Sequence, residues 1–260
     1  MSVTQLNVTR LGEQGPVIAF CHGLFGQGKN WTQIAKAFAA DHRALLIDMP
    51  NHGRSEWTDD FAYLDLADRV ASLFSADDPV TLVGHSMGGK IAMAIALRHP
   101  GLVERLVVVD VSPVNYESGR EFLDYIDTMR GLDLTSLERR DEADAALRDA
   151  VPNTTVRSFL LQNLRREGGG WSWLLNLDLL SAHMPELAGW PSEELGDVTY
   201  DGPVLWIGGA NSAYVADDYA PAMEKLFPRV RRVTIKGAGH WVHSERPEVF
   251  IEVLKRFVRS

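Results

Sequence analysis

The sequence predicts an α/β fold in which a mostly parallel central sheet is flanked by helices and carries one helical insertion. Short apolar runs rich in β-branched residues alternate with segments whose apolar residues recur every three or four positions, which is the pattern of strand–helix units. Several of these runs are apolar on successive residues, as in strands that helices cover on both faces. The alternation is interrupted only once, before the last strands. These observations place a sheet at the centre of the chain.

The expected strands and helices alternate in chain order. The strands are residues 17–20, 44–47, 80–83, 106–109, 204–207 and 232–235. The helices between and after them, each with an apolar stripe, are residues 31–40, 63–74, 89–98, 219–227 and 247–258. This order predicts parallel strands joined by helices.

A long segment between the fourth and fifth strands departs from this alternation. Its expected helices are residues 121–130, 138–150, 155–166 and 176–187, and no strong strand is expected among them. Three glycines at 168–170 interrupt the helical pattern. We therefore predict a first core part at residues 1–112, a helical cap at 113–198 that lies over the sheet, and a second core part at 199–260.

The composition argues against several classes of partner. The chain has 260 residues, 45% of them hydrophobic, and a formal net charge of −9, which disfavours nucleic acid and anionic membrane surfaces. Cys21 is the one cysteine, so no intrachain disulfide is expected, and the N-terminal residues show no export signal. No apolar run is long enough to insert into a membrane. We expect a cytoplasmic protein and leave its oligomeric state open.

Residues 84–88, GHSMG, match the G-x-S-x-G pattern and have the context that this pattern requires, a strand before and a helix after. Such a turn holds Ser86 in a strained conformation with its hydroxyl at the sheet edge. It also directs the backbone N–H of Met87 toward the site, where it would stabilise negative charge. A glycine-rich turn with a spectator serine is the alternative, and the flanking strand and helix disfavour it.

A serine nucleophile needs a base, and His240 is the best candidate. It follows the last expected strand and so lies at the same sheet edge as Ser86. His243 is an alternative in the same loop, but the glycines before His240 give that side chain the freer approach. His22 is expected to hold the loop at 22–26, in which the N–H of Leu24 is the second half of an oxyanion hole. The histidine and cysteine spacings do not fit a metal site, so none is expected.

A carboxylate should orient the imidazole of the base. Asp110 ends the strand at 106–109, and its side chain could reach His240 from the neighbouring strand. Asp217 and Asp218, further along the loop after the next strand, remain alternatives. Asn211 and Ser212 come first in that loop, and neither can carry a charge.

The motifs together resemble the α/β-hydrolase superfamily and, within it, the group of small esterases and thioesterases that includes YbfF and ABHD11-type proteins. The resemblance is carried by residues 22–26 (HGLFG), 48–55 (DMPNHGRS), 84–90 (GHSMGGK), 109–113 (VDVSP), 208–215 (GGANSAYV) and 237–243 (GAGHWVH). It implies that the acid comes from the strand before the insertion, which is Asp110, and that Ser212 lies beside the histidine as a supporting residue. Pro50 and an apparent extra residue at Ala210 depart from the group's pattern.

The resulting prediction is a serine hydrolase that cleaves small carboxylic esters or thioesters through an acyl-enzyme on Ser86, without a cofactor. Phe25 and Trp241 are expected in the substrate pocket, which would accept short- to medium-chain acyl groups. The arginine pairs at 139–140 and 165–166 could meet the phosphates of coenzyme A, although arginines on exposed helices are more often only solvated. The alternatives are a C–C bond hydrolase or perhydrolase on the same fold, and a ligand-binding protein without turnover.

Overall fold

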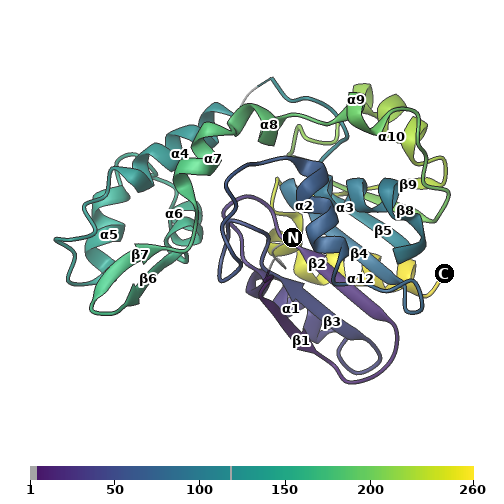
Figure 1. Ribbon diagram of the computed structural model, residues 1–260, viewed down its shortest axis with the longest axis horizontal. Coiled ribbons are helices and arrows are strands. Elements are labelled where there is room, and N and C mark those ends of the chain that lie inside the picture. The colour runs from purple at the N-terminus through teal and green to yellow at the C-terminus, as the bar shows by residue number, and fades with distance from the viewer. Residues whose placement is uncertain (1–4, 118) are drawn as a thin grey trace.

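The computed structural model describes residues 5–117 and 119–260 and contains one large sheet with the strand order β1-β3-β2-β4-β5-β8-β9 (Figure 1). β1 pairs antiparallel with β3, and the other neighbours are parallel. The predicted α/β fold class is therefore confirmed. The strands of this sheet are β1 (Val8–Leu11), β2 (Val17–Cys21), β3 (Arg43–Ile47), β4 (Val80–His85), β5 (Val103–Val109), β8 (Val204–Gly209) and β9 (Val230–Ile235).

Burial explains which strands the sequence reveals. Every residue of β2, β4 and β8 is buried, so these strands are mostly apolar on successive residues. β1 was not expected from the sequence because it is an edge strand whose middle residues, Thr9 and Arg10, are exposed. Residues 1–4, which contributed to the expectation that no export signal is present, lie outside the described part of the chain.

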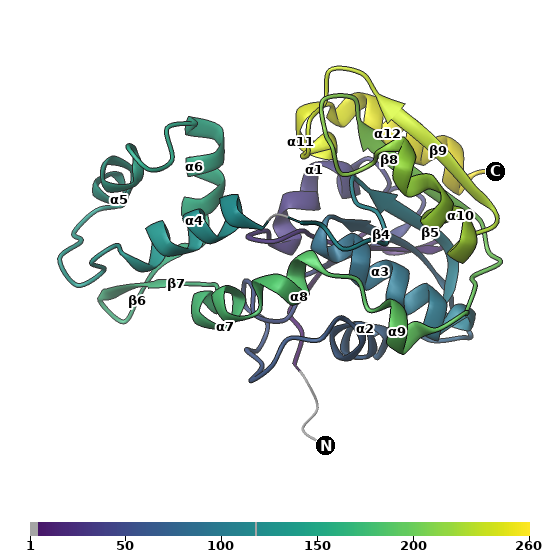
Figure 2. The ribbon, with the colours of Figure 1, turned by 90° about the horizontal axis from the view of Figure 1, so that it is seen from above.

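Helices cover both faces of the sheet (Figure 2). α2, α3 and α10 pack on one face, and α1, α11 and α12 pack on the other. None of the helices within the described residues is long and apolar enough to cross a membrane. The bounds of these elements are η1 (Gly28–Trp31), α1 (Thr32–Lys36), α2 (Tyr63–Ala71), α3 (Met87–Arg98), η2 (Pro100–Leu102), η3 (Asp217–Tyr219), α10 (Ala220–Leu226), α11 (Val242–Glu245) and α12 (Pro247–Val258).

The predicted cap, residues 113–198, lies between β5 and β8 and is not helical throughout. The helix expected at 155–166 ends at Leu161, and the chain then forms an antiparallel hairpin that the sequence analysis did not expect. Gly168 and Gly169 make its turn with φ of 61° and 88°, a region that favours glycine. The elements are α4 (Arg120–Arg130), α5 (Arg140–Leu147), α6 (Thr154–Leu161), β6 (Leu164–Glu167), β7 (Gly170–Trp173), α7 (Leu177–Ala182), α8 (Met184–Ala188) and α9 (Ser192–Leu195).

The prediction of one helix at 176–187 is also wrong, because the chain forms two helices there, α7 and α8, which are separated at His183. Pro185 lies in the first turn of α8 and cannot donate a backbone hydrogen bond, so a continuous helix is disfavoured there. In both views α4 to α7 and the hairpin lie to one side of the sheet, and α8 leads back toward it (Figure 1, Figure 2).

Candidate active site

Ser86 occupies the tight turn between β4 and α3 with φ of 53° and ψ of −121°. Such a positive φ is strained for a residue with a side chain. A Cβ atom added to Gly84 would lie 2.2 Å from the carbonyl oxygen of Gly88, and one added to Gly88 would lie 2.4 Å from that of His22. The turn therefore requires glycine at both positions. It leaves the serine at the carboxyl edge of the sheet, where β4 ends.

The structure brings Ser86, His240 and Asp110 into one chain of hydrogen bonds. The Nδ1 atom of His240 lies 2.8 Å from Oδ2 of Asp110, and its Nε2 atom lies 3.1 Å from the hydroxyl of Ser86. Because a carboxylate only accepts, Nδ1 carries the proton and Nε2 is free to accept the hydroxyl proton of Ser86. Asp110 follows β5 with φ of 51° and is 0% exposed. A serine hydroxyl, an imidazole and a buried carboxylate are thus in contact.

Asp110 has two further partners. Its Oδ1 accepts a hydrogen bond of 2.8 Å from the N–H of Gly209, and its Oδ2 accepts one from the hydroxyl of Ser212. Ser212 therefore binds the acid directly, through the oxygen that faces His240. Asp217 forms an exposed ion pair with Arg232 at 2.6 Å instead of reaching this site.

The neighbouring histidines lie behind His240 and do not bond to Ser86. His85 donates through Nε2 to the carbonyl oxygen of His240 at 2.8 Å, and its ring also contacts that of His243. His243 stacks on Trp31 with ring centroids 4.1 Å apart. Burial lowers the pKa of His85 well below its usual value and the pKa of His243 to about 3, so both rings are neutral near pH 7.

Two buried histidines hold the loop that follows β2. His22 donates through Nδ1 to the carbonyl oxygen of Gly23 at 2.8 Å and accepts the N–H of Met49 at 2.9 Å. His52 accepts the N–H of Phe25 at 3.3 Å. Burial lowers the pKa of both rings, that of His52 to about 3. The contact of His52 with Phe25 could not be predicted from the sequence, because no local pattern signals it.

The backbone N–H of Leu24 lies in the loop after β2, and that of Met87 lies at the start of α3, directly after Ser86. Both residues line the same cavity as the serine. Within residues 5–117 and 119–260, neither N–H has an intramolecular acceptor. These two donors are therefore available to an oxygen atom bound beside Ser86.

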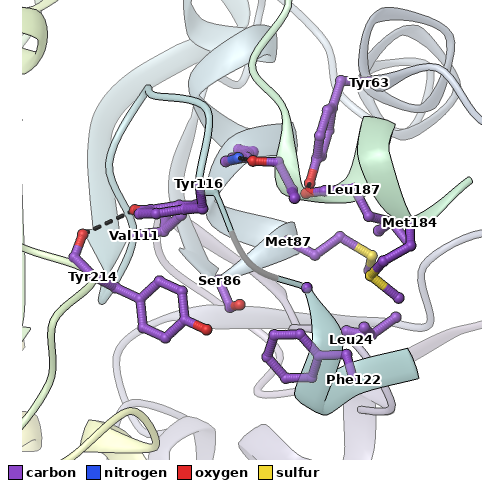
Figure 3. A pocket seen from close by; sticks show the side chains of 13 residues that line it. Leu24, Tyr63, Ser86, Met87, Val111, Tyr116, Phe122, Met184, Leu187 and Tyr214 are labelled. Carbon is purple, nitrogen blue, oxygen red and sulfur yellow. Dashed lines mark hydrogen bonds between the residues drawn. The ribbon is translucent and has the colours of Figure 1, made fainter. Parts of the chain in front are cut away.

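Two cavities meet at Ser86. Ser86 lines both of them. Leu24 and Phe122 line both and so stand between them. Figure 3 shows Tyr63, Met184 and Leu187 gathered at one end of the first cavity, away from Ser86. The second cavity is lined by the predicted pocket residues Phe25 and Trp241, together with Tyr125, Val156, Phe159, Leu160, His85 and His240.

The cap arginines considered for coenzyme A binding are engaged within the cap. Arg140 donates to the carbonyl oxygen of Leu161 at 2.6 Å, and both Arg140 and Arg166 lie over the ring of Trp171. Arg139 and Arg165 pair with neighbouring acidic side chains. Across the described ranges, no group of three or more histidine, cysteine or acidic side chains could hold a metal ion.

Comparison with known proteins identifies the family. A sequence profile for the alpha/beta hydrolase fold matches residues 16–247. The chain belongs to the α/β-hydrolase family. It is 38% identical over 251 residues to the sn-1-specific diacylglycerol lipase ABHD11 of Mus musculus, and the aligned region covers 94% of this chain and 81% of the mouse protein. It is 32% identical over 245 residues to esterase YbfF of Escherichia coli, and the aligned region covers 94% of this chain and 93% of the esterase.

A solved structure agrees with this assignment. A marine microorganism esterase superimposes with a TM-score of 0.93 at 32% sequence identity, over 98% of this chain and 99% of the esterase. The expected resemblance to the YbfF and ABHD11 group is therefore confirmed, and with it the α/β-hydrolase fold.

Proposed function

We propose that this protein is a serine hydrolase that cleaves carboxylic esters through an acyl-enzyme on Ser86. The observation that carries the proposal is the hydrogen-bonded chain from Ser86 through His240 to the buried carboxylate of Asp110. The relatives named as an esterase and a lipase support ester substrates. Thioesters can follow the same steps, with a thiol in place of the alcohol as leaving group. We also propose a cytoplasmic location, which the sequence features described above favour.

In the proposed reaction, Ser86 Oγ attacks the carbonyl carbon of the substrate while its proton moves to Nε2 of His240. The carboxylate of Asp110 stabilises the imidazolium that results. His240 then gives this proton to the leaving oxygen, the bond between that oxygen and the carbonyl carbon breaks, and the acyl group stays on Ser86. A water molecule repeats the two steps with His240 as base and releases the carboxylic acid.

The negative charge that forms on the carbonyl oxygen needs donors in place before the reaction begins. The N–H groups of Leu24 and Met87 are proposed for this role, and their lack of acceptors in the described structure supports it. His22 and His52 hold the loop of Leu24 from two sides, so this donor would not reorganise during the reaction. Loss of one such donor costs about 10²–10³ in kcat.

The two cavities suggest where each half of the substrate binds. The leaving oxygen must lie next to His240 to receive its proton. Because the second cavity contains His240 and the first does not, we assign the leaving group to the second cavity and the acyl chain to the first. Phe122 and Leu24 would separate the two groups. Helices of the cap, residues 113–198, supply walls to both cavities, so this segment would select the substrate.

The proposal is tested by hydrolysis of p-nitrophenyl esters of increasing acyl chain length, beside acyl-coenzyme A thioesters. Ser86→Ala should lower kcat by about 10⁶, toward the uncatalysed rate. The matched control Ser72→Ala, at an exposed site after α2, should leave kcat unchanged. If the wild-type protein cleaves no ester or thioester, the proposal is wrong. Turnover of a β-diketone or peracid formation instead would favour the C–C hydrolase or perhydrolase alternative.

A further inference from the structure

Lys90 is a buried lysine next to the candidate site. It lies on α3, is 1% exposed and lines the first cavity. Its ammonium donates to the carbonyl oxygens of Val114 at 3.1 Å and Ala188 at 2.8 Å, and also to that of Gly189. In the described parts of the chain, no carboxylate forms an ion pair with it. Backbone carbonyls therefore accept the hydrogen bonds of this amino group.

The carbonyl oxygens that accept from Lys90 belong to the two segments that connect the core to the cap, here called the crossings. Val114 lies where the chain leaves the core after β5, and Ala188 and Gly189 lie where it returns at the end of α8. The crossings also bond to each other, since the N–H of Tyr116 donates to the carbonyl oxygen of Ala188 at 3.0 Å. Lys90 thus connects the helix that begins after Ser86 to both crossings at once.

Aromatic rings complete the surroundings of the ammonium. It lies 4.8 Å from the ring centroid of Tyr116 and 5.7 Å from that of Tyr63. The hydroxyl of Tyr63 donates to the carbonyl oxygen of Leu187 at 2.8 Å, so this ring too is fixed against α8. Burial raises the pKa of both tyrosines, so their hydroxyls stay neutral. The acidic side chains nearby in the chain, Glu186 on α8 and residues 193–194 on α9, are exposed to solvent.

We propose that Lys90 is a positioning residue whose ammonium holds the two core–cap crossings against α3 and so fixes the depth of the first cavity. The inference rests on the proposed function, in which this cavity takes the acyl chain. Leu187 and Ala188 line the cavity on the segment that Lys90 holds. Burial lowers the pKa of Lys90 to about 7. The lowered pKa shows that burying the charged form of Lys90 costs free energy, a cost that an apolar side chain of similar length would avoid.

The test compares Lys90→Met, which keeps the length of the side chain but donates no hydrogen bond, with Lys90→Arg, which keeps the charge. The exposed pair Lys225–Asp197 offers a matched control in Lys225→Met. For each variant, kcat and KM are measured on p-nitrophenyl esters of increasing acyl chain length. Labelling of Ser86 by a small fluorophosphonate reports whether the reacting groups are intact.

We expect Lys90→Met to be labelled at a rate near that of wild type but to lose discrimination between acyl chains. The ratio of kcat/KM between the preferred chain and one about four carbons longer should fall by about tenfold, as expected for loss of charge-assisted hydrogen bonds. The change should appear mainly in KM, and Lys90→Arg should restore part of the ratio. Lys225→Met should behave as wild type. Amide hydrogens in residues 113–117 and 184–190 should exchange faster in Lys90→Met than in wild type, and those of the hairpin should not.

The inference is overturned if Lys90→Met keeps both the chain-length profile and the exchange rates of wild type, or if wild type has no preferred chain length. If Lys90→Met does not fold, Lys90→Gln, which retains two N–H donors, is measured in the same way and should show a smaller change in the same direction. A wild-type profile under Lys90→Gln would then overturn the inference. Failure of the proposed function is distinguishable, because in that case wild type itself cleaves no ester.

Discussion

Replacing Asp110 by asparagine should lower kcat by about 10⁴, which corresponds to about 5.4 kcal/mol at about 1.36 kcal/mol per tenfold. The structure shows why no orientation of the amide is harmless. If its oxygen accepts from Gly209, the NH₂ group faces Nδ1 of His240, which must then accept. The ring proton moves to Nε2, and the ring can no longer accept the proton of Ser86. If the amide is reversed, its NH₂ group meets the N–H of Gly209 in a fully buried site, which costs about 1–3 kcal/mol.

The measurement is steady-state hydrolysis of the best p-nitrophenyl ester by Asp110→Asn and by Asp217→Asn, with circular dichroism as the check on folding. Asp217 is the matched control because it is exposed and paired with Arg232. Its loss should change kcat by less than about twofold, as for a solvated ion pair. An Asp110→Asn variant that keeps kcat within about tenfold of wild type, or a larger loss in Asp217→Asn, would refute the reasoning.

Further predictions concern neighbours of the site. Ser212→Ala removes one hydrogen bond to Asp110 and should lower kcat/KM only about tenfold; a loss as large as that of Asp110→Asn contradicts this. Because burial lowers the pKa of His243 to about 3 while the unfolded chain titrates near about 6.5, the folded state loses stability as pH falls through this interval. His243→Phe should reduce that slope by about 1.4 kcal/mol per pH unit in urea titrations, and an unchanged slope excludes the account. Asn163→Ala removes the donor to the carbonyl oxygen of Phe25 and should lower the free energy of unfolding by about 1–3 kcal/mol; equal stability would show that the contact is not needed.

The fold could be predicted largely because β2, β4 and β8, in the middle of the sheet, are buried on every residue and therefore stand out in the sequence. The exceptions have physical reasons. β1 is a half-exposed edge strand, and β6 is polar after Leu164 while β7 alternates tryptophan with glycine and serine, so neither element shows an apolar run. The hairpin is stabilised by pairing with itself, for example Leu164 with Trp173, and by cation–π contacts over Trp171. Such cross-strand contacts leave no periodic signal.

The candidate site divides in the same way. Ser86 could be located because a local motif marks its turn, and Asp110 could be named because parallel strands end at one edge of the sheet. The choice between Asp110 and Asp217 depends on a contact across 130 residues of chain, between Asp110 and His240. The contact of His52 with Phe25, across 27 residues, and that of Lys90 with Gly189, across 99 residues, are also non-local. Single positions in a sequence carry no record of such partners.

The central claim is that Ser86 is activated as a nucleophile by its neighbours in the folded protein. It is tested most directly by treating the folded protein with a fluorophosphonate and locating the adduct by mass spectrometry of peptides. We predict one adduct, on Ser86, which forms at least about 10³ times more slowly in His240→Ala or Asp110→Asn. No adduct on Ser86, or labelling that proceeds as fast in the denatured chain, would contradict the account.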